Sequence, residues 1–163
     1  MIDRYTRPEM GNIFELEHKY EVWQEIEVLA CEAHAELGES GITKEEAKWI
    51  RDHAKFNKAE VDEIEAVTNH DVIAFLTNMG SYIDADVPEG EPKPSRWVHY
   101  GMTSSDLGDT ALCYQLCEAT DILIDDCRKL GEICRRRAFE ERNTLCVGRT
   151  HGIHAEPMTF GMK

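Results

Sequence analysis

The segment from Gly148 to Pro157 concentrates side chains that can do chemistry: a cation, a hydroxyl, two imidazoles and a carboxylate lie within it. Glycine lets a backbone approach a ligand closely, and proline ends the preceding regular structure. An imidazole titrates near neutral pH, so His151 is expected to act as an acid or a base. We interpret Thr150 as a hydroxyl donor to a carboxylate and Glu156 as an orienting group. The alternative is a connecting loop whose polar residues satisfy one another.

Hydroxyl groups gather in a second segment, residues 97–106, just before a long apolar repeat. Ser104 or Ser105 can cap the helix expected there, because a hydroxyl oxygen accepts hydrogen bonds from the unpaired N–H groups of a first turn. Those N–H groups and the positive end of the helix dipole also favour a bound anion. The segment therefore predicts either an anion site or a helix cap alone.

Two earlier segments carry an imidazole or a cation. His70 lies in the run 68–71, at an expected helix start, where a His beside an Asp usually forms a capping or surface pair. It gains a function if folding brings it near His151, because the two imidazoles would then titrate as a coupled pair. Arg4 and Tyr5 could clamp a phosphate. The alternative for that pair is a frayed terminus.

Composition limits the classes of function. The chain has 163 residues, 18 of them Lys or Arg and 32 Asp or Glu, for a formal net charge of −14. This length suits one ordinary domain, or a small domain with part of another. The charge argues against general binding of nucleic acids or anionic membranes, although a small anionic substrate remains compatible with it. No apolar run reaches the length of a membrane span and the N-terminus has no apolar signal core, so we expect a cytoplasmic protein.

The six cysteines fit that compartment, and none forms a C-x-x-C pair. We expect them to be reduced and buried, as small hydrophobic side chains. A zinc site is the alternative. His151 and His154 are weak as metal ligands, because Gly152 and Pro157 oppose a long helix and no third ligand is evident. The sequence therefore predicts no metal.

Apolar periodicity predicts helices along most of the chain. One helix covers about residues 13–37, a capping box at Thr43 opens a second, and a third follows Asn57. A fourth runs over about residues 71–82. The stretch 84–95 holds three prolines and four acids, and is expected to form an exposed loop.

The longest pattern runs from Ser105 to about Arg142 and carries a heptad-like seam. A helix of this length, roughly 50 Å at 1.5 Å per residue, cannot bury its stripe within so short a chain. We therefore expect partner helices from the rest of a larger polypeptide or from other subunits. Only residues 145–147 suggest a strand. Pro157 fits the first turn of a new helix.

The predicted fold is all-α and has two parts. Residues 1–103 form a small N-terminal helical domain. Residues 104–163 begin a central long-helix bundle domain, whose first long helix is followed by a truncation at Lys163.

In this order, the four polar segments resemble the N-terminal part of the adenylosuccinate lyase family, within the fumarase/aspartase superfamily. The resemblance runs through residues 4–5, 69–71, 99–106 and 148–152. It covers essentially the whole chain but only the opening portion of the family's length. The Arg-Thr-His-Gly element is shared by several superfamily lyases. Together with the Arg-Tyr start, the His-Asp pair and the His-Ala-Glu-Pro tail, it indicates the adenylosuccinate branch.

The resemblance implies β-elimination of fumarate from adenylosuccinate, giving AMP, and from the succinyl-carboxamide ribotide of purine biosynthesis. Removing a proton beside a carboxylate builds charge that hydroxyl and N–H donors must stabilise, and the departing nitrogen needs a proton. By resemblance His151 is the general acid, and His70 contacts the phosphate and tunes His151. The implied substrate-binding residues are Arg4, Tyr5, Asn69, Asp71, Thr103, Ser104 and Thr150.

The family implies a homotetramer whose active sites each draw on three subunits, and no cofactor. Its flexible loop with the catalytic base lies beyond Lys163, so the chain alone is expected to be inactive. Two features depart from the family: Asn69 stands where many relatives have Arg, and the loop over 88–94 is longer. The alternatives are another superfamily lyase, such as argininosuccinate lyase or a cycloisomerase, and a non-catalytic helical interaction module.

Overall fold

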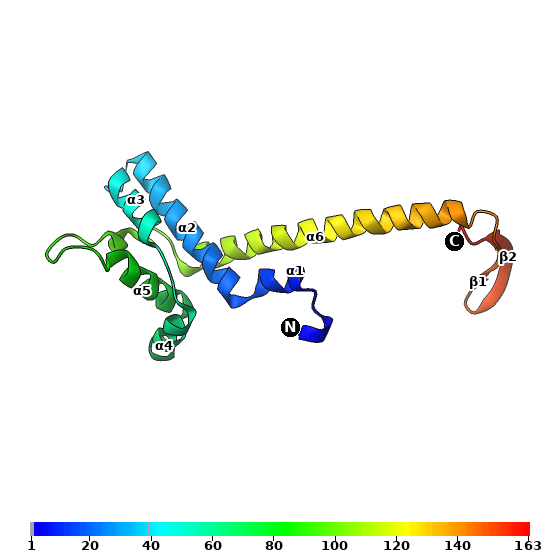
Figure 1. Ribbon diagram of the computed structural model, residues 1–163, viewed down its shortest axis with the longest axis horizontal. Coiled ribbons are helices and arrows are strands. Elements are labelled where there is room, and N and C mark those ends of the chain that lie inside the picture. The colour runs from blue at the N-terminus through cyan, green and yellow to red at the C-terminus, as the bar shows by residue number, and fades with distance from the viewer. Residues whose placement is uncertain (1, 39) are drawn as a thin grey trace. The chain divides into compact units, whose positions relative to one another are not determined.

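The computed structural model describes residues 2–38 and 40–163, and the described chain divides into two compact units. The first ends at Glu118 and the second begins at Ala119, so the boundary lies inside one long helix (Figure 1). The prediction of a mostly helical fold is confirmed, since helices account for most of the described residues.

The first unit is built of helices and short 3-10 turns. In chain order these are η1 (Asp3–Tyr5), α1 (Pro8–Gly11), η2 (Asn12–Phe14), α2 (Leu16–Leu37), α3 (Lys44–His53), α4 (Lys58–Thr68), α5 (Asp71–Asp84), η3 (Pro94–Trp97) and the first part of α6 (Ser104–Glu140). The helices expected from apolar periodicity are confirmed.

Side-chain caps explain where three of these helices begin. Thr43 accepts from the N–H of Glu46, and the Glu46 carboxylate accepts from the N–H of Thr43, so the predicted capping box of α3 is confirmed. Asn57 accepts from two N–H groups at the start of α4. His70 caps α5. Each cap pairs N–H groups that a helix leaves unsatisfied at its first turn.

An aromatic cluster forms the centre of the first unit. The ring of Tyr20 stacks on that of Phe75, with centroids 5.2 Å apart. Its centroid lies 5.5 Å from that of Trp23 and 5.8 Å from that of Phe56, with which it forms a T-shaped pair. Such offset and edge-on contacts add to the free energy gained from burying large rings. Aliphatic side chains from several helices complete the core: Val28, Ile50, Val61, Met79, Ile83 and Leu107 are fully buried.

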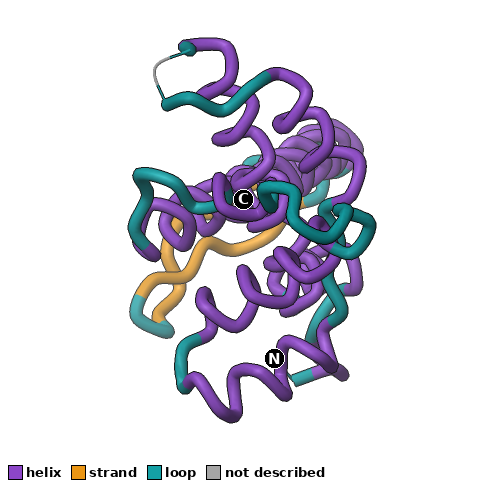
Figure 2. Tube along the Cα trace, turned by 90° about the vertical axis from the view of Figure 1, so that its left-hand side faces the viewer, coloured by secondary structure: helices purple, strands orange, loops and turns teal. Residues whose placement is uncertain are grey.

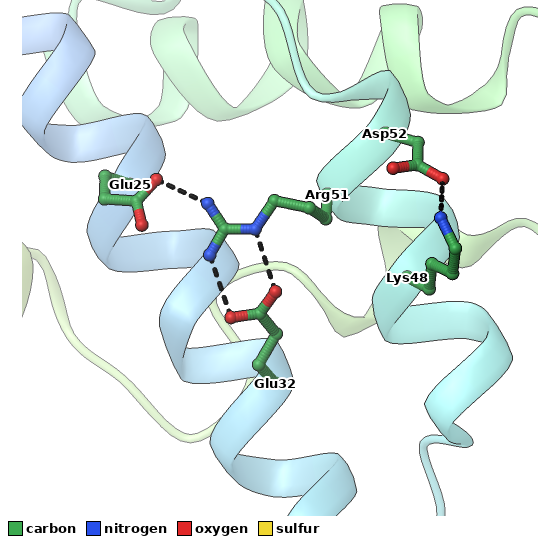
Figure 3. A network of polar contacts seen from close by, with 5 residues as sticks. All are labelled: Glu25, Glu32, Lys48, Arg51 and Asp52. Carbon is green, nitrogen blue, oxygen red and sulfur yellow. Dashed lines mark hydrogen bonds and ion pairs between the residues drawn. The ribbon is translucent and has the colours of Figure 1, made fainter.

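An ion-pair network joins α2 to α3 on the surface (Figure 3). Arg51 donates two hydrogen bonds of 2.8 Å to the Glu32 carboxylate and one of 2.6 Å to Glu25. On the outer side of α3, Lys48 pairs with Asp52. A bidentate guanidinium–carboxylate pair fixes geometry as well as charge, so this network orients α3 against α2.

The second unit contains the rest of α6 and a hairpin of β1 (Leu145–Thr150) and β2 (Ile153–Thr159), the orange strands of Figure 2. The strands are antiparallel, and a two-residue turn at His151 and Gly152 joins them. Both turn residues have positive φ, 51° and 75°, as the turns favoured in tight hairpins require.

The prediction that a helix begins at Pro157 is therefore wrong. Pro157 lies in β2 opposite Val147, and the register shifts between Val147 and Arg149. Proline cannot donate to a strand ladder, but it is tolerated in edge strands and beside such irregularities. The strand suggested at residues 145–147 is confirmed.

The expectation of buried cysteines holds only for Cys31. The four cysteines on α6 are exposed, and Cys146 is half-buried. Leucines of the α6 seam are exposed too, including Leu112, Leu123 and Leu130. Across residues 2–38 and 40–163, no helix combines the length and apolar character needed to cross a membrane.

Candidate active site

A cavity of about 440 Å³ in the first unit brings together residues from α2, α5 and α6. Two of the predicted substrate-binding residues, Asp71 and Ser104, line it. They are 33 positions apart in the sequence, so the fold, and not chain proximity, places them together. Other polar lining residues are Lys19, Ser105, Asp109 and Gln115.

Lys19 is the one cation among the cavity's lining residues, and its role was not predicted from the sequence. Its ammonium group lies 4.2 Å from the ring centroid of Trp23 and 3.5 Å from Oδ2 of Asp71. The aromatic face and the carboxylate both attract the cation, so together they fix its position. The spacing of four residues between Lys19 and Trp23 was the available signal, since such residues are neighbours on one helix face.

His70 and Asp71 are positioned by the start of α5. Nδ1 of His70 accepts from the N–H of Ile73 at 3.4 Å, which in the neutral ring leaves the proton on Nε2. Oδ1 of Asp71 accepts from the N–H of Val72 at 2.8 Å. Asp71 therefore uses one oxygen on the backbone and the other on Lys19.

Asn69 ends α4 in the left-handed conformation, with φ of 51°. Asparagine tolerates this backbone conformation better than most residues, because its short side-chain amide can form hydrogen bonds with nearby backbone groups. Here Nδ2 of Asn69 donates to the carbonyl of Val67 at 3.3 Å. The structure thus gives a backbone reason for asparagine at this position.

Thr103 and Ser104 lie where α6 begins. The helix starts at Ser104, so Thr103 occupies the cap position, where the sequence predicts Ser104 or Ser105. The backbone N–H of Thr103 donates to the Asp106 carboxylate at 2.8 Å, and its carbonyl accepts from the N–H of Asp106 at 2.9 Å. These bonds fix the backbone of Thr103 at the start of α6.

The remaining predicted residues lie in exposed segments. In η1 the guanidinium of Arg4 lies 4.8 Å from the ring centroid of Tyr5, and both side chains are exposed. Thr150 and His151 belong to the second unit, at the tip of its hairpin. Glu156, expected to orient a neighbour, is exposed on β2. No group of three metal-ligating side chains gathers anywhere in the part of the chain that the structure describes.

Curated proteins similar to this chain include adenylosuccinate lyases. One from Bacillus subtilis (strain 168) is 47% identical over 163 residues, and one from Staphylococcus saprophyticus is 44% identical over the same length. Each match covers 100% of this chain and 36% of the relative. The chain thus spans about a third of the length of these relatives.

Solved structures share the fold. The 3-carboxy-cis,cis-muconate lactonizing enzyme from Pseudomonas putida has a TM-score of 0.85 and 29% identity, over 99% of this chain and 36% of that one. A fumarate lyase from Mesorhizobium sp. BNC1 has a TM-score of 0.83 at 21% identity, over 96% of this chain and 36% of that one. The profile of the lyase family matches residues 4–163, and the chain therefore belongs to the lyase family.

Proposed function

We propose that this chain is part of an adenylosuccinate lyase, which eliminates fumarate from adenylosuccinate to leave AMP and acts likewise on the succinyl-carboxamide ribotide. The observation that carries the proposal is the 44–47% identity to two such enzymes across all 163 residues. The cavity that joins Asp71 to Ser104 supports it, because it places polar groups from separate helices around one small volume.

The reaction breaks a carbon–nitrogen bond and moves two protons. A base removes one proton from the carbon beside a carboxylate, the electron pair forms the double bond of fumarate, and the amino nitrogen leaves with a proton from an acid. We assign the acid to His151, which the hairpin turn presents to solvent with φ of 51°. Thr150, next to it, is assigned to the succinyl carboxylate.

The remaining assignments concern substrate binding. Thr103 and Ser104 lie at the start of α6, where N–H groups and the helix dipole favour an anionic substrate. The Nε2–H of His70 is available to donate to a phosphate oxygen, and this supports its contact with the phosphate. Asn69 and Asp71, the neighbours of His70 in the sequence, are assigned to the substrate pocket as well. Arg4 and Tyr5 supply a cation and a phenol for the same phosphate.

A paired substitution tests the acid assignment. In the protein expressed from its whole gene, His151→Gln should lower fumarate release from adenylosuccinate by at least a hundredfold, because a positioned acid contributes about 10²–10⁴-fold. His154→Gln is the matched control: it changes an exposed imidazole of the same hairpin and should retain most activity. Activity of His151→Gln equal to wild type would exclude the assignment.

One further candidate has a specific observation in its favour. The Pseudomonas putida lactonizing enzyme shares the fold at a TM-score of 0.85, so a cycloisomerase activity is a second proposal. Parallel assays with adenylosuccinate and with 3-carboxy-cis,cis-muconate distinguish the two. Fumarate release alone would support the lyase proposal, and lactone formation alone would support the cycloisomerase proposal in its place.

We also propose how the enzyme assembles, where it acts and how its domains divide. We propose a homotetramer that acts in the cytoplasm on a small molecule without a cofactor, with domains divided at residues 103 and 104. The exposed apolar stripe of α6 supports assembly through this helix. Sedimentation of the whole protein would measure its mass, and a monomer at assay concentrations would contradict the tetramer.

A further inference from the structure

Glu27 is a fully buried carboxyl group on α2. One of its oxygens accepts from the backbone N–H of His99 at 2.7 Å, and the other lies 2.6 Å from Nδ1 of the His99 ring. A buried carboxyl group is costly unless hydrogen bonds replace its hydration. Both oxygens of Glu27 are thus committed to a single residue far along the chain.

That residue has an unusual backbone. His99 has φ of 63°, in the left-handed region that non-glycine residues seldom adopt. Such conformations persist where surrounding contacts impose them, and they cluster at functional sites. The two contacts with Glu27 hold both the backbone and the ring of His99, so Glu27 supports this conformation.

Two more residues of α2 hold the same segment. Sγ of Cys31 donates to the carbonyl of Trp97 at 3.5 Å, and Nε2 of His34 lies 3.3 Å from the carbonyl of Tyr100. With Glu27 they recur at steps of four and three residues, which places all three on one face of the helix. This face of α2 contacts residues 97–100, a segment that ends three positions before Thr103.

We propose that Glu27 is a positioning residue, which acts through His99 to place Thr103 and Ser104 at the start of α6. Glu27 itself touches no substrate. The inference rests on the proposed function, since it takes Thr103 and Ser104 as substrate contacts. It goes further by tracing their placement to a buried carboxyl group on α2.

The kinetic test uses the protein expressed from its whole gene and adenylosuccinate. Glu27→Ala should raise KM at least tenfold, and Glu27→Gln, which keeps an acceptor for the His99 N–H, should recover part of that loss. Glu36→Gln is the control, because it alters an exposed glutamate of the same helix. A purely structural role would lower the active fraction, and hence kcat, and leave KM unchanged; that result would overturn the proposal.

A double-mutant cycle tests whether the effect passes through His99. If it does, Glu27→Ala should add little to the KM increase already caused by His99→Ala, because residues that act as one unit give non-additive effects. Independent, additive effects of the two substitutions would contradict the proposed route.

Hydrogen exchange gives a readout that does not depend on activity. Glu27→Ala should speed exchange of the amides of residues 98–104 and leave those of α4 and α5 protected. Unchanged protection of residues 98–104 would overturn the inference even if the enzyme proved to have another substrate. An inactive wild-type protein would instead refute the proposed function, and the exchange measurement would still decide the role of Glu27.

Discussion

His18 shows how one residue of the first unit joins two helices. Its Nε2 lies 2.8 Å from a carboxylate oxygen of Glu118 on α6, and its Nδ1 lies 3.2 Å from Glu21 on α2. The hydrogen bond to Glu118 is the main influence that raises the pKa of His18 above its ordinary value of 6.5, and Glu21 adds to it against the opposing effect of burial. The protonated imidazole is therefore the form that stabilises this contact.

The sign of the pH dependence follows from that raised pKa. The stabilisation by His18 is fully present below pH 6.5 and is lost as pH rises through the folded-state pKa. We expect His18→Gln to lower the free energy of unfolding by up to about 1 kcal/mol near pH 6 and by less at about pH 9, in urea titrations of the 163-residue chain. Glu118→Gln should reproduce most of the difference. A loss that does not vary with pH would contradict the charged pair.

Sequence alone indicated some site residues but not their partners. His70 and Asp71 could be identified because a cap has a local signature, and the structure confirms a helix start there. Glu27 has no local signature and Lys19 has only its spacing of four residues from Trp23, because their roles come from His99 and Asp71, which are more than fifty positions away. A residue whose role depends on such distant partners has little signature in the residues next to it in the sequence.

At the scale of single elements, α3 depends on its first turn. Thr43→Ala removes the hydroxyl of the capping box and should cost about 1 kcal/mol of unfolding free energy, measured by urea denaturation. Thr110→Ala makes the same chemical change at an exposed position inside α6, where alanine is the better helix former. This control should be neutral or slightly stabilising. An equal loss in both variants would show that the cap does not matter.

The second strand of the hairpin, β2, is the element that the sequence predicted wrongly. Pro157 is compatible with a helix start and with an edge strand, and local preference cannot decide between them. Pairing with β1 decides, because it satisfies backbone groups on both sides of the turn at His151 and Gly152. The helices were predictable since each repeats its apolar residues over several turns, whereas this hairpin exposes most of its side chains on both faces and has no such stripe.

Gly161 fixes the end of the hairpin against the last turn of α6. Its N–H donates to the carbonyl of Glu141 at 3.0 Å, and a Cβ there would overlap the carbonyl oxygen of Ala138 and lie 2.8 Å from the backbone nitrogen of Arg142. Gly161→Ala should therefore detach the hairpin, and hydrogen exchange of the β1 and β2 amides should rise. Gly131→Ala meets nothing within 4 Å and should stabilise α6 by up to about 1 kcal/mol. Unchanged exchange in Gly161→Ala would exclude this anchoring role.

At the scale of the whole molecule, two surface properties oppose each other. Large apolar side chains are exposed along α6 and on the hairpin, among them Leu123, Leu130, Phe139, Leu145 and Ile153. Exposed apolar groups in this number favour association. The formal net charge of −14 keeps copies apart. Salt screens charge and leaves the apolar attraction intact, so ionic strength should shift the balance.

We therefore expect the 163-residue chain to self-associate, with a mass by light scattering that rises with protein concentration and with salt. Leu123→Glu combined with Leu130→Glu should lower that mass, because the substitutions remove apolar surface from α6. The control adds a negative charge at a polar position: Asn143→Glu lies in the exposed turn after α6 and should alter association only at low salt, where charge repulsion acts. A monomer of constant mass at every salt concentration would show that the apolar stripe does not drive assembly.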